Sequence, residues 1–167
     1  MSILITYAGK TGTTERCAKI LNQKLKNSTI IDLNKEDVNI SNYDLIIIGS
    51  NIRMGRFNNK VSNFIKKNKD ILKTKKTAYF ICCGFKDSYK KYYDENIDKA
   101  LLDRAITYDT FGGELDMDKY KGFDKFIINI VKKTEEGKKE VKILEENIDS
   151  FVNRICGFVN RICEEEY

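Results

Sequence analysis

Five short apolar runs recur along the chain, and stretches with helical spacing separate them. The runs are Ile3–Tyr7, Ser28–Leu33, Tyr43–Ser50, Thr77–Gly84 and Ala105–Gly113. The first is short, β-branched and unbroken, which is typical of a buried strand. The third contains a continuous apolar stretch, which indicates a strand of a parallel sheet with helices on both faces. The pattern therefore predicts five strands.

The intervening stretches predict helices on the spacing of their apolar residues. Three predicted helices are marked by apolar stripes: Thr14, Cys17, Ala18, Leu21 and Leu25 in the first, Phe57, Val61, Phe64 and Ile65 in the second, and Phe123, Phe126, Ile127 and Ile130 in the third. Two more are predicted by range, a short amphipathic helix near Ile97–Ala105 and a final helix from about Val141 to Cys163. Strands alternating with helices predict an α/β fold with a doubly wound, five-stranded parallel sheet in the order 2-1-3-4-5. No linker is visible, so we expect one domain over residues 1–167.

The sequence FVNRIC occurs twice in the final predicted helix, at Phe151–Cys156 and at Phe158–Cys163. The apolar residues there repeat with heptad spacing: Leu144, Ile148, Phe151, Ile155, Phe158 and Ile162. The favoured interpretation is a last helix packed on the sheet. The alternative is that its extra turns pair with another subunit, giving a homo-oligomer, or touch a membrane.

Composition excludes several classes of chemistry. The chain has 167 residues, a net charge of +5, five cysteines and no histidine. Without histidine there is no Ser-His-Asp or Cys-His triad and almost no catalytic zinc arrangement. The chemistry must then use carboxylates, lysines, thiols or a cofactor. The cysteines form no CxxC pair, which favours reduced thiols in a cytoplasm.

Membrane and partner signals are weaker. No apolar run is long enough to span a bilayer, and the N-terminus lacks the basic start and cleavage site of a signal peptide. The positive charge favours anionic partners such as acidic small molecules or an anionic membrane surface. We expect no nucleic-acid partner.

The stretch GKTGTT, residues Gly9–Thr14, joins the first predicted strand to a helix N-terminus. Free backbone N–H groups and the positive end of the helix dipole form an anion site there. Thr11, Thr13 and Thr14 add hydroxyl donors. Neither the Walker pattern nor GxGxxG is present, so a terminal phosphate monoester fits better than a nucleoside triphosphate or a dinucleotide.

Two further loops follow the third and fourth predicted strands. In GSNIRMGRF, Gly49 and Gly55 permit unusual backbone angles, Ile52 and Met54 offer apolar faces to a flat ring, and Arg53 offers charge. In CCGFKDSY, Phe85 or Tyr89 could stack on a ring. Cys82 and Cys83 are neighbours and point to opposite faces, which favours buried core cysteines over a redox pair.

GKTGTT after a first strand resembles the phosphate loop of the flavodoxin family, T/S-x-T-G-x-T. Thr11, Gly12, Thr13 and Thr14 occupy the family positions. Gly9 departs from the family, which usually has Ser or Thr there, and Lys10 could supply the missing contact. The resemblance implies a flavodoxin-like fold that binds FMN noncovalently.

Two segments, YDLIIIGSNIRMGRFNNKVSNFIKKN and GGELDMDKYKGFDKFIINIVKK, resemble a narrower family, the flavodoxin-type menaquinone-dependent protoporphyrinogen oxidases. The resemblance covers most of residues 1–141 and is weak from Phe85 to Arg104. It implies a cytoplasmic FMN protein at the inner membrane face, which takes electrons from a porphyrinogen and passes them to a quinone. We expect Arg53 to contact the flavin or a substrate carboxylate. The implied cofactor-binding residues are Gly9, Lys10, Thr11, Gly12, Thr13 and Thr14 for the phosphate, and Ser50, Asn51, Ile52, Arg53, Met54, Gly55, Cys82, Cys83, Gly84 and Phe85 around the isoalloxazine.

Charge separates this interpretation from its alternatives. The stretch Arg56–Lys76 carries eight Lys or Arg residues against one Asp, whereas electron-shuttle flavodoxins are typically strongly acidic. Such a surface could meet anionic lipid or steer an acidic substrate, or it could be an ordinary solvated helix face. The second hypothesis is a flavodoxin that shuttles electrons between proteins. The third is a binding module that has lost the flavin, which Gly9 and the absence of an aromatic residue at Ile52 and Met54 would favour.

Overall fold

A parallel sheet forms the centre of the protein. We describe a computed structural model of the chain over residues 1–84, 86–114 and 141–165. The main strands lie in the order β2-β1-β3-β5-β6, all parallel, with bounds β1 Ile3–Ala8, β2 Ser28–Asp32, β3 Leu45–Arg53, β5 Lys76–Cys82 and β6 Thr107–Thr110. These are the five predicted strands, so the predicted flavodoxin-like order 2-1-3-4-5 is confirmed.

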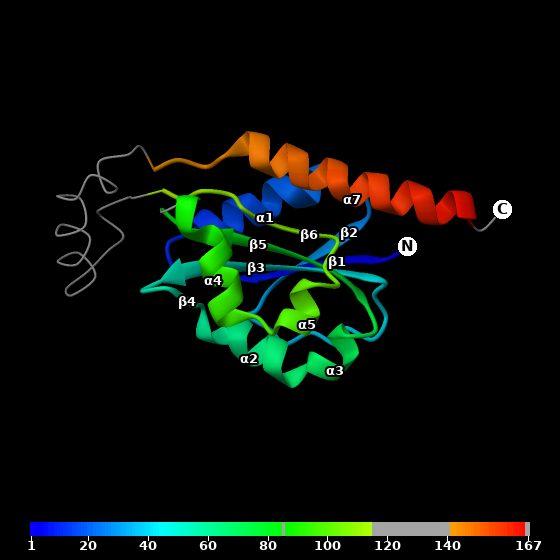
Figure 1. Cartoon of the computed structure of the whole chain (residues 1–167), viewed down its shortest axis with the longest axis horizontal. Helices are drawn as coiled ribbons and strands as arrows, with labels where there is room; N and C mark the ends of the chain where they lie inside the picture. The colour runs from blue at the N-terminus through cyan, green and yellow to red at the C-terminus, as the bar shows by residue number, and fades with distance from the viewer. Residues whose placement is uncertain (85, 115–140, 166–167) are drawn as a thin grey trace.

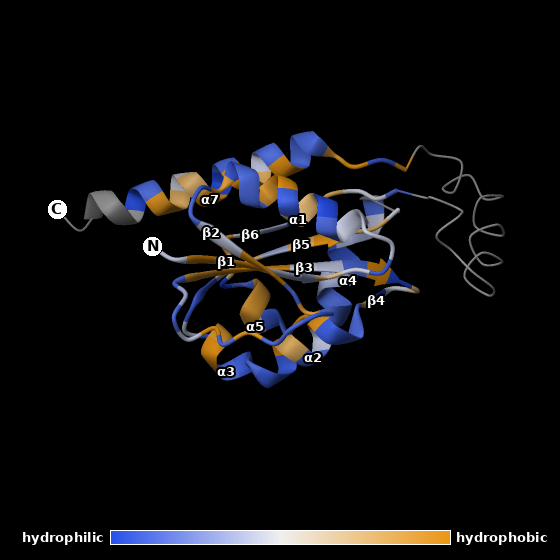
Figure 2. Ribbon diagram, turned by 180° about the vertical axis from the view of Figure 1, so that it is seen from behind, coloured by the Kyte–Doolittle hydropathy of each residue, from blue (hydrophilic) through white to orange (hydrophobic). Residues whose placement is uncertain are grey.

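Helices cover both faces of the sheet (Figure 1). The helices on one face are α1 (Thr13–Lys24) and α7 (Glu145–Glu165), and those on the other are α2 (Asn59–Lys67), α3 (Lys69–Leu72), α4 (Tyr89–Asn96) and α5 (Lys99–Leu102). A single 3-10 turn, η1 (Lys86–Ser88), precedes α4. Apolar residues of both helical layers face the sheet (Figure 2), and they form two separate cores above and below it.

The structure differs from the sequence prediction after the third strand. Residues Arg56–Phe57 form β4, which pairs antiparallel with the end of β3, so Phe57 lies in a hairpin and not in the predicted helix. The turn is made by Met54 with φ 51° and Gly55 with φ 76°. Two successive residues with positive φ match the twist of a tight hairpin, which explains why β3 runs on to Arg53.

The region between β5 and β6 contains two short helices where one was predicted. The short helix near Ile97–Ala105 is wrong in its bounds, since Asp98 caps the shorter helix α5 through a hydrogen bond from the Ala100 N–H to its carboxylate (2.9 Å). A separate helix, α4, precedes it over Tyr89–Asn96, where only a polar stretch was expected. The helix predicted around Phe123–Ile130 lies outside the described residues.

A row of aromatic rings crosses the core from β5 to α7. The Phe80 ring stacks on Phe111 at 4.7 Å between centroids, and Phe111 meets Phe151 edge-on at 5.2 Å. Gly49 on β3 lies opposite Phe80 in the sheet register. A Cβ at position 49 would lie 2.1 Å from the ring of Phe80, so this glycine is required for close packing. The sequence predicts that Gly49 and Gly55 adopt unusual backbone angles. This is confirmed for Gly55, whose φ is positive, and wrong for Gly49, whose φ is not.

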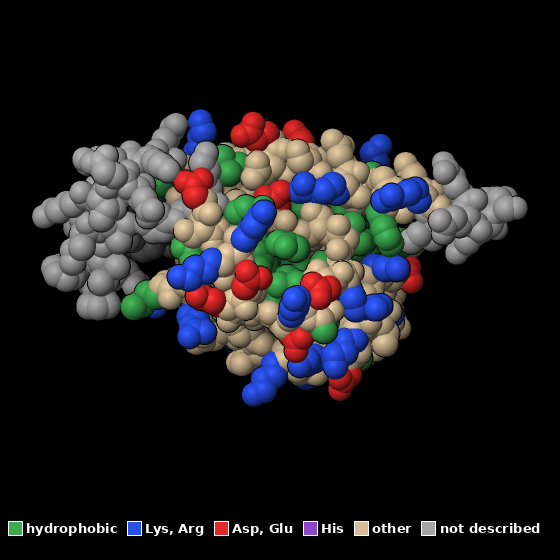
Figure 3. Space-filling view, viewed as in Figure 1, with side chains coloured by type: hydrophobic (Ala, Val, Ile, Leu, Met, Phe, Trp, Pro, Cys, Tyr) green, Lys and Arg blue, Asp and Glu red, His purple; other side chains and the backbone are tan. Residues whose placement is uncertain are grey.

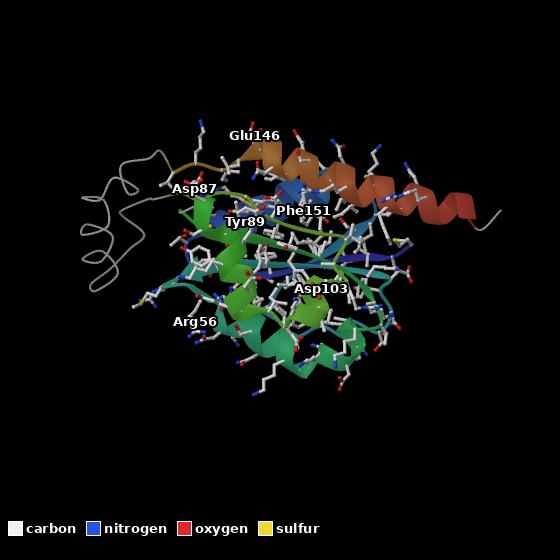
Figure 4. All side chains as sticks on the ribbon, viewed as in Figure 1. Arg56, Asp87, Tyr89, Asp103, Glu146 and Phe151 are labelled. Carbon is white, nitrogen blue, oxygen red and sulfur yellow. The ribbon has the colours of Figure 1, made fainter. Side chains whose placement is uncertain are left out.

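Helix α7 packs on the sheet through its first half. Ile148, Phe151 and Ile155 are fully buried, and Phe151 lies between α7 and the sheet (Figure 4). Arg154 pairs with Asp109 of β6 at 2.5 Å. These contacts support the interpretation of the heptad pattern as a packed last helix; pairing with a second subunit stays a prediction.

Within the described residues, no helix is both long and apolar enough to span a membrane.

Candidate functional site

The predicted site residues that the structure describes lie at the ends of β1, β3 and β5, at the carboxyl edge of the sheet. Ala8 at the end of β1 lies opposite Ser50 of β3, and Asn51 lies opposite Cys82 at the end of β5. The three loops that follow these strands therefore start side by side, although they are far apart in sequence. Such an edge is where doubly wound sheets bind their ligands.

The first loop presents a helix N-terminus without a side-chain cap. Gly12 has φ 89°, a left-handed conformation that glycine adopts without strain, and α1 begins at the next residue. Thr13 and Thr14 in the first turn are buried. The side chain of Asn34 donates to the carbonyl of Gly9 at 3.1 Å and anchors the start of the loop to the neighbouring chain after β2.

Gly9, the departure from the family pattern, has a steric explanation. A Cβ at position 9 would lie 2.9 Å from both Cβ and Oγ1 of Thr14. Real Cβ atoms essentially never approach so closely, so a serine or threonine at position 9 would need the Thr14 side chain to move. The Thr14 side chain therefore occupies the space that the serine or threonine usual in the flavodoxin family would need at position 9.

Charges of both signs surround the first loop. Burial, with the nearby carboxylates of Asp32 and Glu15 adding to it, raises the pKa of Tyr7 to about 12, so its phenol is neutral at physiological pH. A hydrogen bond from Lys19 and its positive charge lower the pKa of Glu15. The loop itself contributes N–H and O–H donors, together with Lys10.

The second loop is held by a network of asparagines. The Asn58 N–H donates to Ser50 Oγ at 2.9 Å, and its side-chain amide donates to Asn51 Oδ1 at 3.0 Å. Ser50 is buried, and its hydroxyl also donates to the Asn51 carbonyl. The structure thus places the side chain of Ser50 inside the framework of the loop, where it positions the backbone that follows.

Helix α4 holds the tip of the β3–β4 hairpin. The Asn96 side chain donates to the Gly55 carbonyl at 2.8 Å and accepts from the Phe57 N–H at 3.0 Å. The tip itself is exposed: Met54 is 72% accessible, and Arg53 and Arg56 lie directly opposite each other across the hairpin. Sequence reasoning included Asn51 but missed Asn58 and Asn96, because an asparagine that fixes another loop has no local sequence signal.

The third loop begins with two buried cysteines. Cys82 packs in the core under α1, and Cys83 in the opposite core, with its sulfur 3.4 Å from Thr110 Oγ1. A hydrogen bond with the Cys17 thiol, together with burial, raises the pKa of Cys82, so this thiol stays protonated. The prediction of core cysteines that point to opposite faces is confirmed.

The remaining residues of the third loop are more exposed. Gly84 is exposed, and Phe85 lies outside the described residues. Tyr89 turns its ring edge-on toward Tyr93 at 6.3 Å. Figure 4 shows Asp87 and Tyr89 at the start of α4 and Arg56 in β4, near the same end of the sheet. The three loops thus surround one edge with polar backbone, an apolar tip and two arginines.

Glu114, just after β6, is a further residue at this edge that sequence reasoning missed. Its carboxylate forms an ion pair with Arg16 of α1 and accepts from the Thr13 hydroxyl at 3.5 Å. A residue 101 positions away in sequence thus reaches the first turn of α1. Only the tertiary structure brings these groups together.

The donors of the first loop fit a phosphate group. Backbone N–H groups at an uncapped helix N-terminus and the threonine hydroxyls favour an anion, and a carboxylate of the chain itself already contacts Thr13. In the described residues no cluster of Cys, Asp or Glu could hold a metal ion. This arrangement defines the class: a doubly wound α/β protein with a glycine- and threonine-rich loop and an uncapped helix N-terminus after its first strand.

The chain belongs to the flavodoxin family, because the family model described as "Flavodoxin domain" matches residues 4–142. It is similar to the protoporphyrinogen IX dehydrogenase [quinone] of Escherichia coli strain K12, with 23% identity over 153 residues that cover 85% of this chain and 84% of the relative.

Solved structures show the same fold. A flavoprotein from Lactobacillus acidophilus NCFM, crystallised with FMN, superposes with a TM-score of 0.54 at 18% identity, over 65% of this chain and 92% of that chain. Rubredoxin:oxygen oxidoreductase from Desulfovibrio gigas superposes with a TM-score of 0.50 at 12% identity, over 71% of this chain and 32% of that chain. The resemblance to flavodoxins drawn from the sequence is confirmed.

Proposed function

We propose that this flavodoxin-family protein is an FMN-dependent oxidoreductase that takes electrons from protoporphyrinogen IX and passes them to a quinone. The observation that carries the proposal is the similarity to the Escherichia coli dehydrogenase, which extends over 85% of this chain and 84% of that protein. FMN as the cofactor is supported by the flavodoxin domain and by the FMN bound in the Lactobacillus flavoprotein.

Each loop has a separate task in this proposal. Gly9–Thr14 binds the phosphate with backbone N–H groups and hydroxyls. Ser50–Gly55 and Cys82–Phe85 flank the flavin ring, with Ser50 and Asn51 holding the backbone through Asn58. Bound FMN supplies the two-electron redox chemistry. No side chain of the protein needs to act as a general base, and the Cys82 thiol stays protonated because its hydrogen bond with Cys17 and its burial raise its pKa.

The basic stretch after the hairpin supports a peripheral contact with an anionic membrane, but only in part. Lysines crowd the surface of α2 and α3, with acidic residues among them (Figure 3). Lys67 pairs with Asp37, Lys69 with Asp98 and Lys73 with Asp70. Each exposed pair contributes little, so these lysines can exchange their partners for anionic lipid headgroups. The attraction to the headgroups is strongest at low ionic strength, where screening by salt is least.

Anaerobic turnover tests the proposal. The purified protein, reconstituted with FMN, is mixed with protoporphyrinogen IX and a menaquinone analogue, and porphyrin fluorescence is followed. We expect flavin-dependent porphyrin formation, with the quinone reduced in step. Protein without FMN is the control for spontaneous oxidation. Tight FMN binding with no porphyrin above that control would contradict the substrate and leave the cofactor standing.

Replacing Arg53 with alanine is expected to lower kcat/KM for the porphyrinogen about tenfold, the value of one charge-assisted hydrogen bond to a carboxylate. The dissociation constant for FMN should change by less than about twofold, because the proposed phosphate loop binds a different part of the cofactor and is separately anchored through Asn34. Arg56→Ala is the matched control, since Arg56 lies opposite Arg53 and carries the same charge. Equal losses in turnover and FMN affinity, or equal effects of both variants, would count against the assignment.

The second candidate is an electron shuttle between redox proteins. It is favoured by one observation, the exposed Met54 at the hairpin tip, which offers an apolar contact to a protein partner beside the flavin. The midpoint potentials of the two flavin couples separate the candidates. Two widely separated couples, the second at very low potential, together with no porphyrin formation, would favour the shuttle.

A further inference from the structure

The backbone before Glu114 is fixed by three interactions. The Cys83 N–H donates to the Gly112 carbonyl at 2.7 Å, and the Gly113 N–H donates to the Lys142 carbonyl at 3.1 Å. Gly112 also forms a bridge with Ile143 and has φ 72°, where a Cβ would lie 2.2 Å from the Lys142 carbonyl oxygen. Glu114 therefore leaves a defined point beside the first loop.

The carboxylate of Glu114 uses the groups that an anion in the first loop would need. Its Oε2 atom accepts from the hydroxyl of Thr13, which is buried, and forms the ion pair with Arg16. Arg16 lies beside the loop: a Cβ on Gly12 would be 3.8 Å from its Nη1 atom, and its own N–H donates to the Gly12 carbonyl at 3.0 Å. The backbone of Arg16 is thus fixed in the first turn of α1, and its guanidinium lies close to Gly12.

Carboxylate and phosphate cannot both hold these groups. Arginine binds either anion through the same fork of N–H donors, and a phosphate dianion close to the Glu114 carboxylate would be repelled. The ion pair is partly exposed, with 44% of the Arg16 side chain and 36% of the Glu114 side chain accessible, so exchanging the partner of Arg16 is inexpensive.

We propose that Glu114 is an internal competitor for the FMN phosphate and that Arg16 is a further phosphate ligand. On binding, the phosphate displaces the Glu114 carboxylate from Thr13, and Arg16 transfers its ion pair from Glu114 to the phosphate. Arg16 then makes the protein discriminate FMN from riboflavin, and Glu114 lowers its affinity for FMN. This inference rests on the proposed binding of FMN and is independent of the proposed substrate.

The test compares FMN with riboflavin, which lacks the phosphate, by quenching of flavin fluorescence on the full chain. Arg16→Gln is expected to raise the dissociation constant for FMN about tenfold and to leave that for riboflavin within about twofold. Glu114→Gln is expected to lower the dissociation constant for FMN about threefold, again without an effect on riboflavin. Inorganic phosphate should compete with FMN more effectively in Glu114→Gln than in the unmodified protein.

Matched controls come from the same helix. Glu15 and Lys19 pair with each other at 2.7 Å one turn apart, and Glu15→Gln and Lys19→Gln remove the same charges without touching the Arg16–Glu114 pair. Their effects on FMN affinity should be smaller than those of the test variants. Arg16→Lys keeps the charge and is expected to retain part of the preference for FMN, and thermal unfolding followed by circular dichroism checks that each variant folds.

Four results would overturn the inference. They are an equal loss of FMN and riboflavin affinity in Arg16→Gln, no change in that variant, weaker FMN binding in Glu114→Gln, and control effects as large as those of the test variants. A protein that binds FMN normally in all variants disproves this inference alone. If the variants change FMN affinity as expected but no porphyrin is formed, only the proposed substrate is disproved. If the protein does not bind FMN, the proposed function and this inference are both disproved.

Discussion

Gly49→Ala is expected to lower the free energy of unfolding by about 3 kcal/mol, at the upper end of the usual cost of overpacking a core. The new Cβ would lie 2.1 Å from Cζ of Phe80, and this ring is held between the central strands and Phe111. Urea denaturation followed by circular dichroism measures the change. Gly157→Ala in α7 is the matched control, because a Cβ there would meet nothing within 4 Å, and we expect it to stabilise the helix by about 1 kcal/mol.

A second substitution separates steric overlap from other effects at position 49. Phe80→Leu should lower stability by itself, since the stacked contact with Phe111 is lost. In the double variant the ring is absent, so Gly49→Ala should cost much less than it does alone. Additive losses in the double variant, or a Gly49→Ala protein as stable as the unmodified chain, would show that the close approach to Phe80 is not what requires glycine.

The second large effect concerns the cofactor. Replacing both Thr11 and Thr13 with alanine is expected to raise the dissociation constant for FMN about a hundredfold, from the loss of two hydrogen bonds to a charged group. The measurement is fluorescence titration with FMN and with riboflavin, and the loss should appear with FMN only. Thr29→Ala, on the exposed side of β2, is the control for losing a threonine hydroxyl.

If the doubly substituted protein binds FMN as tightly as the unmodified one, the phosphate does not depend on these hydroxyls and the assignment of Thr11 and Thr13 is wrong. If the affinity for riboflavin falls together with the affinity for FMN, the substitutions have disturbed the loop as a whole. In that case the buried position of Thr13 in the first turn of α1 would be the cause.

The sequence was sufficient for the five main strands, because buried parallel strands leave long apolar runs such as that of β3. Their alternation with helices then indicated the order of a doubly wound sheet. The sequence failed at Phe57, where an apolar residue at helical spacing from Val61 belongs to a hairpin instead. The hairpin turns at Met54, whose positive φ is rare for a residue with a side chain. No spacing of apolar and polar residues in the sequence indicates such a backbone angle.

For the site, sequence was sufficient for the loops and insufficient for their supports. Gly12 and the threonines follow a local motif, so their positions could be predicted. Asn96 and Glu114 reach the site from other elements, 41 residues beyond Gly55 and 101 residues beyond Thr13, and no local pattern marks such residues. The same holds for Gly49, whose necessity depends on a ring in the neighbouring strand.

The packing of α7 also has a consequence during synthesis. The sheet face that carries Ile47 and Phe80 is covered jointly by α1 and α7, and the buried residues of α7 begin only at Ile148. Until this helix leaves the ribosome, part of that apolar face has no cover and is open to chaperones or to aggregation. The nascent chain can therefore complete its core only after translation has passed Ile155.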